Sequence, residues 1–408
     1  MGHPETRRQF LRKSLLGLTG IPLLNSCPNP RKKIYEISNQ NEVLKYRTLG
    51  KTGIKIPILS MGTGNWVQPN LIKAAITEGL TFFSTSQVYS NGNVQRMLGR
   101  ILQEYPRDSY FIATSVRTEG IDSKAGLYTK EADPVKLKYR LDESLKDLRR
   151  ENVDIFILPY AARRESVFFE PYLRAMEDIK KQGKARYIGI ATHSYEAEAI
   201  RAAKDTKIYD VVMTSYNYRQ DHRQDVTEAI DYAANAGLGI IGMKTMAGYL
   251  YYWDQELKEP INTKAFLKWA FQNPNVHTVV SGFNNYEQLN ENISAMNELE
   301  LTPEEKLNLG MVRDRFPTGL YCQQCGRCIP QCRASLDIPS IMRSYMYAYG
   351  YRDMLLARDT LMGTGVSLIT CASCRDCPIH CTKGFDIKRK ITDISRLVYV
   401  PEEFLKSS

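Results

Sequence analysis

The chain has 408 residues, of which 43% are hydrophobic and 25% are charged, so it can bury a large core. Its formal net charge of +10 is concentrated at the N-terminus, where residues 1–33 hold seven Lys or Arg side chains against one Glu. Because no basic patch with interleaved aromatic residues stands out elsewhere, the composition argues against a nucleic-acid-binding protein. No apolar run reaches the ~20 residues that a membrane-spanning helix needs.

Residues 1–27 read as a targeting signal and not as part of the fold. The stretch "TRRQFLRKSLLGL" has paired arginines, an apolar pair behind them and a short, weakly apolar run, and it resembles a twin-arginine export signal. The signal ends in "LLNSC", which resembles the lipobox of bacterial lipoproteins and makes Cys27 the residue to be lipidated. A basic disordered tail with an unmodified cysteine is the alternative.

The two resemblances imply an exported, periplasmic protein that is anchored to the membrane only through a lipid on Cys27. Residues 28–45 are then expected to form a linker. Twin-arginine export carries folded proteins, so a cofactor assembled in the cytoplasm can travel inside the chain.

Between residues 46 and 315, short apolar runs rich in β-branched residues alternate with amphipathic stretches such as "DPVKLKYRLDESLKDLRR". This pattern predicts an α/β fold, a (β/α)8 barrel of the usual size. A doubly wound open sheet is the alternative, but "GTGNW" follows the first run instead of the G-x-G-x-x-G turn of that fold. The eight predicted strands lie within residues 56–62, 80–86, 110–116, 153–159, 185–191, 209–216, 238–245 and 276–282.

Eight of the nine cysteines fall into two copies of the pattern C-x2-C-x2-C-x3-C after residue 320. Disulfides do not need this crowding, and zinc is satisfied by two C-x2-C pairs, although structural zinc stays an alternative. Three close thiolates on one iron-sulfur cubane, with a fourth reaching across to a second cubane, explain both the spacing and the duplication. The predicted ligand sets are Cys322, Cys325, Cys328 and Cys381 for one [4Fe-4S] cluster, and Cys371, Cys374, Cys377 and Cys332 for the other.

The cysteine motifs predict a small, mainly helical, ferredoxin-like domain over residues 316–400, followed by a tail over 401–408. The bacterial pattern usually has Pro after the last Cys, and here Arg333 and Thr382 stand there. Each motif is followed by a similar tail, "LDIPSIM" and "FDIKRKI", as expected for two pseudo-symmetric halves.

The segments "YRTLGKTGIKIPILSMGTGNW", "GKARYIGIATHS", "GLGIIGMKTMAGY" and "VVSGFNNYEQLNENI" together resemble the aldo-keto reductase superfamily, in the branch with a C-terminal iron-sulfur domain. The resemblance covers nearly all of residues 46 to 400. It implies a nicotinamide dinucleotide across the C-terminal mouth of the barrel, and a Tyr that, assisted by Asp, Lys and His, protonates a carbonyl as hydride arrives.

Carried over position by position, this catalytic set is mostly missing. Tyr89 keeps the place of the acid, but Ser84, Ser115 and Pro159 stand where the resemblance places Asp, Lys and His. A phenol has a reference pKa of about 10, and Ser115 cannot supply the positive charge that would ease loss of its proton. Tyr89 is therefore either a catalytic residue or a packing residue.

Two other residues are candidates for a remodelled site. Lys244, at the mouth end of the seventh predicted strand, is the second predicted catalytic residue, because it could lend positive charge. His193, on a loop after the fifth strand, could act as an acid. The alternatives are an ion-paired or solvated lysine and a histidine that only bonds its own loop.

The predicted cofactor site is also only partly kept. Gly282, Glu291 and Asn292 keep the places that the resemblance assigns to the adenine end of NAD(P)H, with helix-surface solvation as the alternative for the last two. The places of the polar groups that would hold the nicotinamide carboxamide are taken by Ala191, Thr192 and Met213.

The sequence therefore predicts an exported oxidoreductase that exchanges electrons between a ligand at the barrel mouth and two [4Fe-4S] clusters. A non-enzymatic electron-transfer protein with the barrel as scaffold is the main alternative, and an ordinary NAD(P)H-dependent carbonyl reductase is a third. The expected partners are a redox protein or a quinone-linked electron chain, and a small-molecule substrate.

Overall fold

The computed structural model describes residues 44–248, 262–314, 320–368, 370–371 and 374–405. These residues belong to the unit Val43–Ser408, while the unit Met1–Glu42 lies outside the described part of the chain. The predicted signal, Cys27 and nearly all of the predicted linker are therefore outside it as well.

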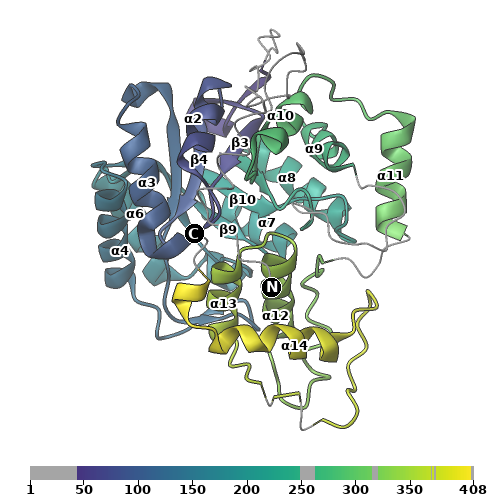
Figure 1. The fold of residues 1–408 in the computed structure, drawn as a ribbon. Coiled ribbons are helices and arrows are strands. Elements are labelled where there is room, and N and C mark those ends of the chain that lie inside the picture. The colour runs from purple at the N-terminus through teal and green to yellow at the C-terminus, as the bar shows by residue number, and fades with distance from the viewer. Residues whose placement is uncertain (1–43, 249–261, 315–319, 369, 372–373, 406–408) are drawn as a thin grey trace, which may run out of the picture. The chain divides into compact units, whose positions relative to one another are not determined.

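Eight parallel strands form a closed barrel in chain order, and the last strand pairs with the first. Each strand lies in one of the eight predicted runs, and only Thr192 extends beyond its run. Closure confirms the (β/α)8 prediction and rules out the open sheet (Figure 1). The strands are β3 (Leu59–Gly62), β4 (Phe82–Ser86), β5 (Phe111–Ser115), β8 (Val153–Leu158), β9 (Ala185–Thr192), β10 (Val211–Ser215), β11 (Gly239–Met243) and β12 (Thr278–Ser281).

Helices cover the outside of the barrel, and α4 is one that begins where the sequence supplies a side-chain cap. Asp133 precedes α4, its carboxylate accepts a hydrogen bond from the backbone N–H of Lys136 (2.9 Å), and Pro134 occupies the first helical position. The helices of this part are α2 (Pro69–Thr77), α3 (Asn93–Leu102), α4 (Pro134–Asp147), α5 (Arg164–Val167), α6 (Glu170–Lys181), α7 (Glu196–Thr206), α8 (Arg223–Asn235), α9 (Thr263–Phe271), α10 (Tyr286–Ser294) and α11 (Pro303–Asp314).

An antiparallel hairpin, β1 (Tyr46–Thr48) and β2 (Lys55–Pro57), brings apolar side chains to the barrel interior. Leu49, Ile54 and Ile56 pack in one buried cluster with inward-facing strand residues such as Phe82. The turn lies against the start of β11, where Lys51 N–H donates to the carbonyl of Gly237 (2.8 Å). The hairpin therefore covers the N-terminal end of the barrel, and the C-terminal end is left for a site.

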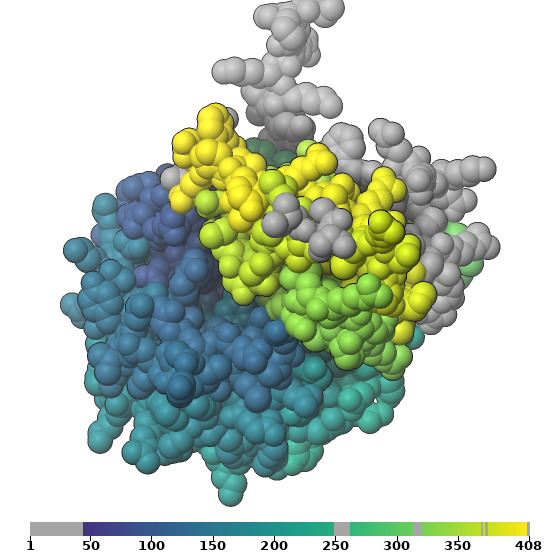
Figure 2. Space-filling model, turned by 90° about the horizontal axis from the view of Figure 1, so that it is seen from below, coloured from purple at the N-terminus to yellow at the C-terminus, as the bar shows by residue number. Residues whose placement is uncertain are grey.

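The C-terminal residues form α12 (Ile338–Tyr349), α13 (Met354–Met362) and α14 (Ile387–Ser395). Separately, a short antiparallel pair, β6 (Ile121–Asp122) and β7 (Leu127–Tyr128), lies in the barrel loop between β5 and α4. Residues of α12 share a buried apolar cluster with Ala247 and Phe266 of the barrel part. Figure 2 shows the C-terminal segments together on one face, beside barrel segments. Within the described residues, none of the helices is long and apolar enough to span a membrane.

Candidate functional site

A cavity of about 220 Å³ lies at the C-terminal mouth of the barrel. It brings together positions that the sequence assigned to the catalytic set, because parallel strands all end on the same side of a barrel. Tyr89, Ser84, Ser115 and Pro159 line it, and so does Lys244. The four positions of the predicted catalytic set therefore converge, although three of them carry other side chains.

Helices α12 and α13 with the residues between them, called the cap below, form part of the wall of this cavity. Tyr347 of α12, Tyr351 and Asp353 all contribute to its lining. The Asp353 carboxylate accepts a hydrogen bond from Asn65 Nδ2 (2.6 Å) and caps α13 by accepting one from Leu356 N–H (2.9 Å). Burial raises the pKa of the Asp353 carboxyl group, and these hydrogen bonds partly offset the increase. The cap is thereby fastened directly to a barrel loop.

Lys244 is the one lysine or arginine among the described residues that line the cavity. It follows β11 directly, its backbone is held at a φ of 55°, and such strain often accompanies functional positions. Its Nζ donates to the hydroxyl of Tyr347 (3.1 Å) and lies 4.9 Å from the centre of the Tyr347 ring. Burial, together with the positive charge of Arg343, lowers the pKa of Lys244 well below its usual value, while Glu196 opposes this.

Among the described residues, no lysine or arginine is among the groups that shift the pKa of Tyr89. Burial, and then the nearby Tyr347 and Asp353, raise the pKa of its phenol. Ser115, at the predicted lysine position, donates to the hydroxyl of Ser86 (2.9 Å). Tyr89 therefore stays protonated, and none of these contacts helps it to release a proton.

His193 lines the main cavity and a small neighbouring one. Its Nδ1 is buried without a hydrogen-bond partner among the described residues. Burial, followed by the charges of Lys244 and Arg343, lowers its pKa well below the usual value. The imidazole is therefore neutral at pH 7, and it does not make the loop hydrogen bond through Nδ1 that the sequence offered as the alternative.

The predicted cofactor residues are not all brought together. Gly282 lines the cavity, but Glu291 and Asn292 are not among the described residues that do. The Asn292 side chain is buried and donates to Ser281 Oγ (3.1 Å), while Glu291 accepts a hydrogen bond from Thr263 Oγ1 (2.7 Å). Asn292 is therefore engaged inside the protein, whereas Glu291 is exposed and is held at the surface by Thr263.

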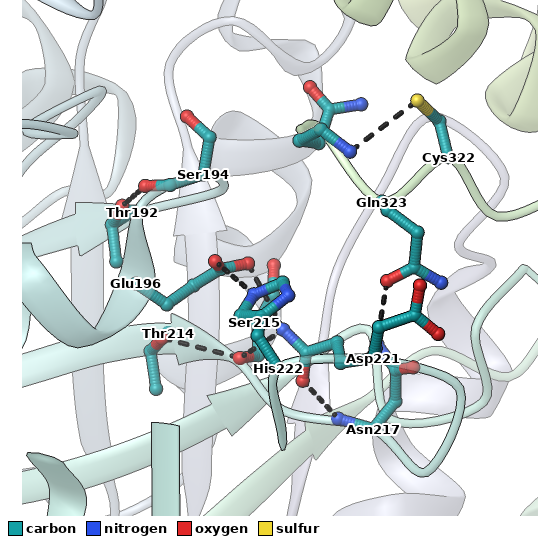
Figure 3. Close-up of polar contacts among 12 residues, drawn as sticks. Thr192, Ser194, Glu196, Thr214, Ser215, Asn217, Asp221, His222, Cys322 and Gln323 are labelled. Atoms are coloured by element: carbon teal, nitrogen blue, oxygen red, sulfur yellow. Dashed lines mark hydrogen bonds and ion pairs between the residues drawn. The ribbon is translucent and has the colours of Figure 1, made fainter. Parts of the chain in front are cut away.

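The positions predicted to hold the nicotinamide end of the cofactor do not match either. Ala191 and Met213 line the cavity with carbon and sulfur atoms, and the hydroxyl of Thr192 donates to the carbonyl of Ser194 (2.6 Å; Figure 3). No side-chain polar group at these three positions is left to hold a carboxamide. These three positions therefore do not supply the polar groups that the resemblance assigns to the nicotinamide carboxamide.

The eight cysteines are unpaired thiols in the structure, and they surround two further cavities. The cavities divide them into the same two sets that the sequence paired, each with one thiol from the other motif. Cys322, Cys325, Cys328 and Cys381 line one cavity, and Cys332, Cys371, Cys374 and Cys377 line the other.

The chemistry of both cavities suits iron-sulfur clusters. Backbone N–H groups of Gln324 and Lys383 donate to Sγ of Cys322 and of Cys381 (both 3.4 Å). Burial raises the pKa of the Cys322 thiol to about 12. A bound metal would lower this pKa and stabilise the thiolate. Within the described residues no three potential ligands converge on one ion, which a cubane does not require because each cysteine binds a different iron.

The small cavity shares wall residues with both the main cavity and the first cysteine cavity. His193 and Lys244 line both the main and the small cavity, and Cys322 lines both the small and the first cysteine cavity. Tyr321 and Arg343 also line the small cavity. The barrel mouth and the first cysteine set are therefore neighbours.

Two contacts fix the first cysteine set against the barrel. Gln323 accepts a hydrogen bond from Asp221 N–H (3.0 Å; Figure 3). Lys383 Nζ lies 2.6 Å from the Asp221 carboxylate. The loop that carries Asp221 and His222 is also held by the buried Glu196, whose carboxylate lies 2.9 Å from Nε2 of His222. This hydrogen bond raises the pKa of His222.

Sequence reasoning missed the contribution of the cap. No motif marks Tyr347 or Asp353, and the only available signal is the aromatic run "SYMYAYGY" after the first cysteine motif. Likewise, nothing in the sequence links Glu196 with His222.

Comparisons with known proteins show that the barrel is similar to one family. The aldo/keto reductase family model matches residues 68–266. L-galactose dehydrogenase of Arabidopsis thaliana is 25% identical over 63% of this chain and 89% of its own length. L-glyceraldehyde 3-phosphate reductase of Escherichia coli K12 is 27% identical over 64% of this chain and 90% of its own.

A solved structure shows the same fold. An aldo-keto reductase of Bacillus halodurans, in its holo form, has a TM-score of 0.53 and 19% identity, over 66% of this chain and 96% of its own. Aldo/keto reductases typically use NAD(P)H. The family model, the relatives and the fold together support the assignment of this chain to the aldo/keto reductase superfamily.

Proposed function

We propose that this aldo/keto reductase-like oxidoreductase exchanges electrons between a small organic ligand in the mouth cavity and two [4Fe-4S] clusters held by the cysteines. When bound, such clusters supply one-electron redox chemistry. The observation that carries the proposal is the shared wall, in which Lys244 and His193 face both the main and the small cavity and Cys322 faces both the small and the first cysteine cavity.

The residues of the chain would perform three tasks. The cap around Tyr347 and Asp353 excludes water from the cavity, and Lys244 and Tyr347 present proton donors to the ligand. The contacts of Asp221 with Gln323 and Lys383 hold the first cysteine set at a fixed place beside the barrel. A rigid arrangement of this kind suits electron exchange.

The proposal includes the domain division at residues 46–315, 316–400 and 401–408, and export by the twin-arginine route with a lipid on Cys27. The arginine pair and the "LLNSC" stretch support export. A non-enzymatic electron-transfer protein is the second candidate, and it is favoured by the three replaced catalytic positions.

Anaerobic titration of the cluster-loaded protein tests the proposal. We expect dithionite to bleach the clusters with uptake of about two electrons and with about eight irons per chain. We expect NADH and NADPH neither to bind nor to bleach, because Ala191 and Met213 offer no polar group to a carboxamide. Bound zinc in place of iron would contradict the cluster proposal, and rapid bleaching by NADPH would contradict the exclusion of nicotinamide.

A further inference from the structure

The mouth cavity differs from an ordinary hydrophobic pocket at one end. Trp66, Tyr89, Tyr160 and Met246 make much of its wall aromatic or apolar. Lys244 is the only lysine or arginine on the wall within the described residues, and its Nζ donates to the Tyr347 hydroxyl at 3.1 Å. The cavity therefore has an apolar body and one donor-rich corner.

The two groups of this corner come from different parts of the chain. Lys244 directly follows barrel strand β11, and Tyr347 belongs to helix α12 of the cap. Because Lys244 donates to the phenol oxygen, the phenol proton is left to point elsewhere, and no described group accepts it. A ligand oxygen in the cavity is the partner that this geometry lacks.

The size of the cavity limits the ligand. Its volume of about 220 Å³ exceeds the ~150 Å³ of a cavity that holds benzene, and it is below the ~300 Å³ at which pockets for drug-sized ligands begin. A single substituted ring fits these limits.

We propose that Lys244 and Tyr347 form a composite oxygen-binding pair for a single-ring organic ligand that carries a carbonyl or carboxylate oxygen, such as a quinone or an aromatic acid. The ring lies among the aromatic and methionine side chains, and its oxygen accepts hydrogen bonds from the Lys244 amine and the Tyr347 hydroxyl. The inference deepens the proposed function, on which it rests, by naming the ligand class of the mouth.

This pair can take over the role of proton donor that the family pattern gives to Tyr89. A phenol that receives a hydrogen bond from a lysine can donate its own proton more readily than one with only apolar neighbours. Tyr347 has such a lysine and Tyr89 does not. The structure thus assigns to the cap a donor that the barrel strands no longer supply.

Calorimetric titration of the cluster-loaded protein with benzoate tests the pair. We expect benzoate to bind the wild type, Tyr347→Phe to weaken binding about 10-fold, and Lys244→Met to weaken it about 100-fold. Tyr345→Phe, on the same helix but outside the cavity lining, should change the affinity less than about twofold.

Toluene, which needs no donor, serves as the probe of an intact cavity. It should bind the wild type and both cavity variants alike, so that a variant with a collapsed cavity is recognised. Wild type that binds no benzoate, or variants that bind benzoate as tightly as wild type, would overturn the pair. Since no electron transfer is involved, these results are independent of the dithionite and NADPH titration.

Discussion

Replacing Cys381 with alanine is expected to remove the same cluster as replacing Cys322, although the two residues lie in different motifs. Both thiols line one cavity, and Cys332 lines the other together with Cys371. Alanine at Cys322, Cys381, Cys332 or Cys371 should each time remove about half of the iron. The reason is that a cubane that lacks one of its four ligands is not retained.

Iron analysis and EPR of the reduced variants provide the measurement. The spectra should fall into two classes, with Cys322→Ala and Cys381→Ala in one and Cys332→Ala and Cys371→Ala in the other. Thr382→Ala, an exposed neighbour of a ligand, should keep all its iron. If Cys381→Ala instead gave the spectrum of Cys371→Ala, each motif would hold a cluster of its own and the crossed arrangement would be wrong.

Two lysine variants should change stability in opposite directions. Lys268 is 2% exposed and its Nζ lies 3.0 Å from the Glu305 carboxylate, so Lys268→Met should lower the free energy of unfolding by about 3–5 kcal/mol through an unpaired buried carboxylate. Lys244 has no carboxylate in ion-pair contact among the described residues, and its cavity disfavours the charged amine. Lys244→Met should therefore raise the melting midpoint, by about 1–3 °C.

The pH dependence follows from the lowered pKa of Lys244. Below that lowered pKa the folded protein carries the full penalty of a buried charge, and wild type recovers stability as pH rises towards the unfolded value of about 10.5. The advantage of Lys244→Met over wild type should shrink over that window, as measured by thermal melting of cluster-loaded protein. A Lys244→Met variant that melts well below wild type at pH 7 would indicate a structural lysine.

The barrel could be predicted from the sequence because its information is local. Each strand is a short buried run such as "VDIFILP", and the cap of α4 is set by two adjacent residues, Asp133 and Pro134. The cysteine sets could be proposed for the same reason, since their spacing is local and repeated.

The donor corner could not be predicted, because it depends on tertiary contacts between distant residues. Lys244 and Tyr347 are 103 positions apart, and Asn65 and Asp353 are 288 positions apart. For Tyr89, the position in the family pattern could be recognised from the sequence. Whether its proton can leave depends on the surrounding groups, which the sequence does not give. Local matches therefore located the site, and only the packing of the cap showed which groups face the ligand.

Electron exchange through the mouth can be measured with a ring-sized quinone. Two reduced clusters supply one electron each, and duroquinone takes up two electrons and two protons to become the hydroquinone. The protein would be reduced anaerobically, freed of reductant and mixed with duroquinone, and the return of cluster absorbance would be followed with and without saturating benzoate. We expect benzoate to slow reoxidation about tenfold or more, because it occupies the cavity that adjoins Cys322. An unchanged rate in the presence of bound benzoate would mean that the quinone oxidises the clusters at the protein surface and that the mouth takes no part.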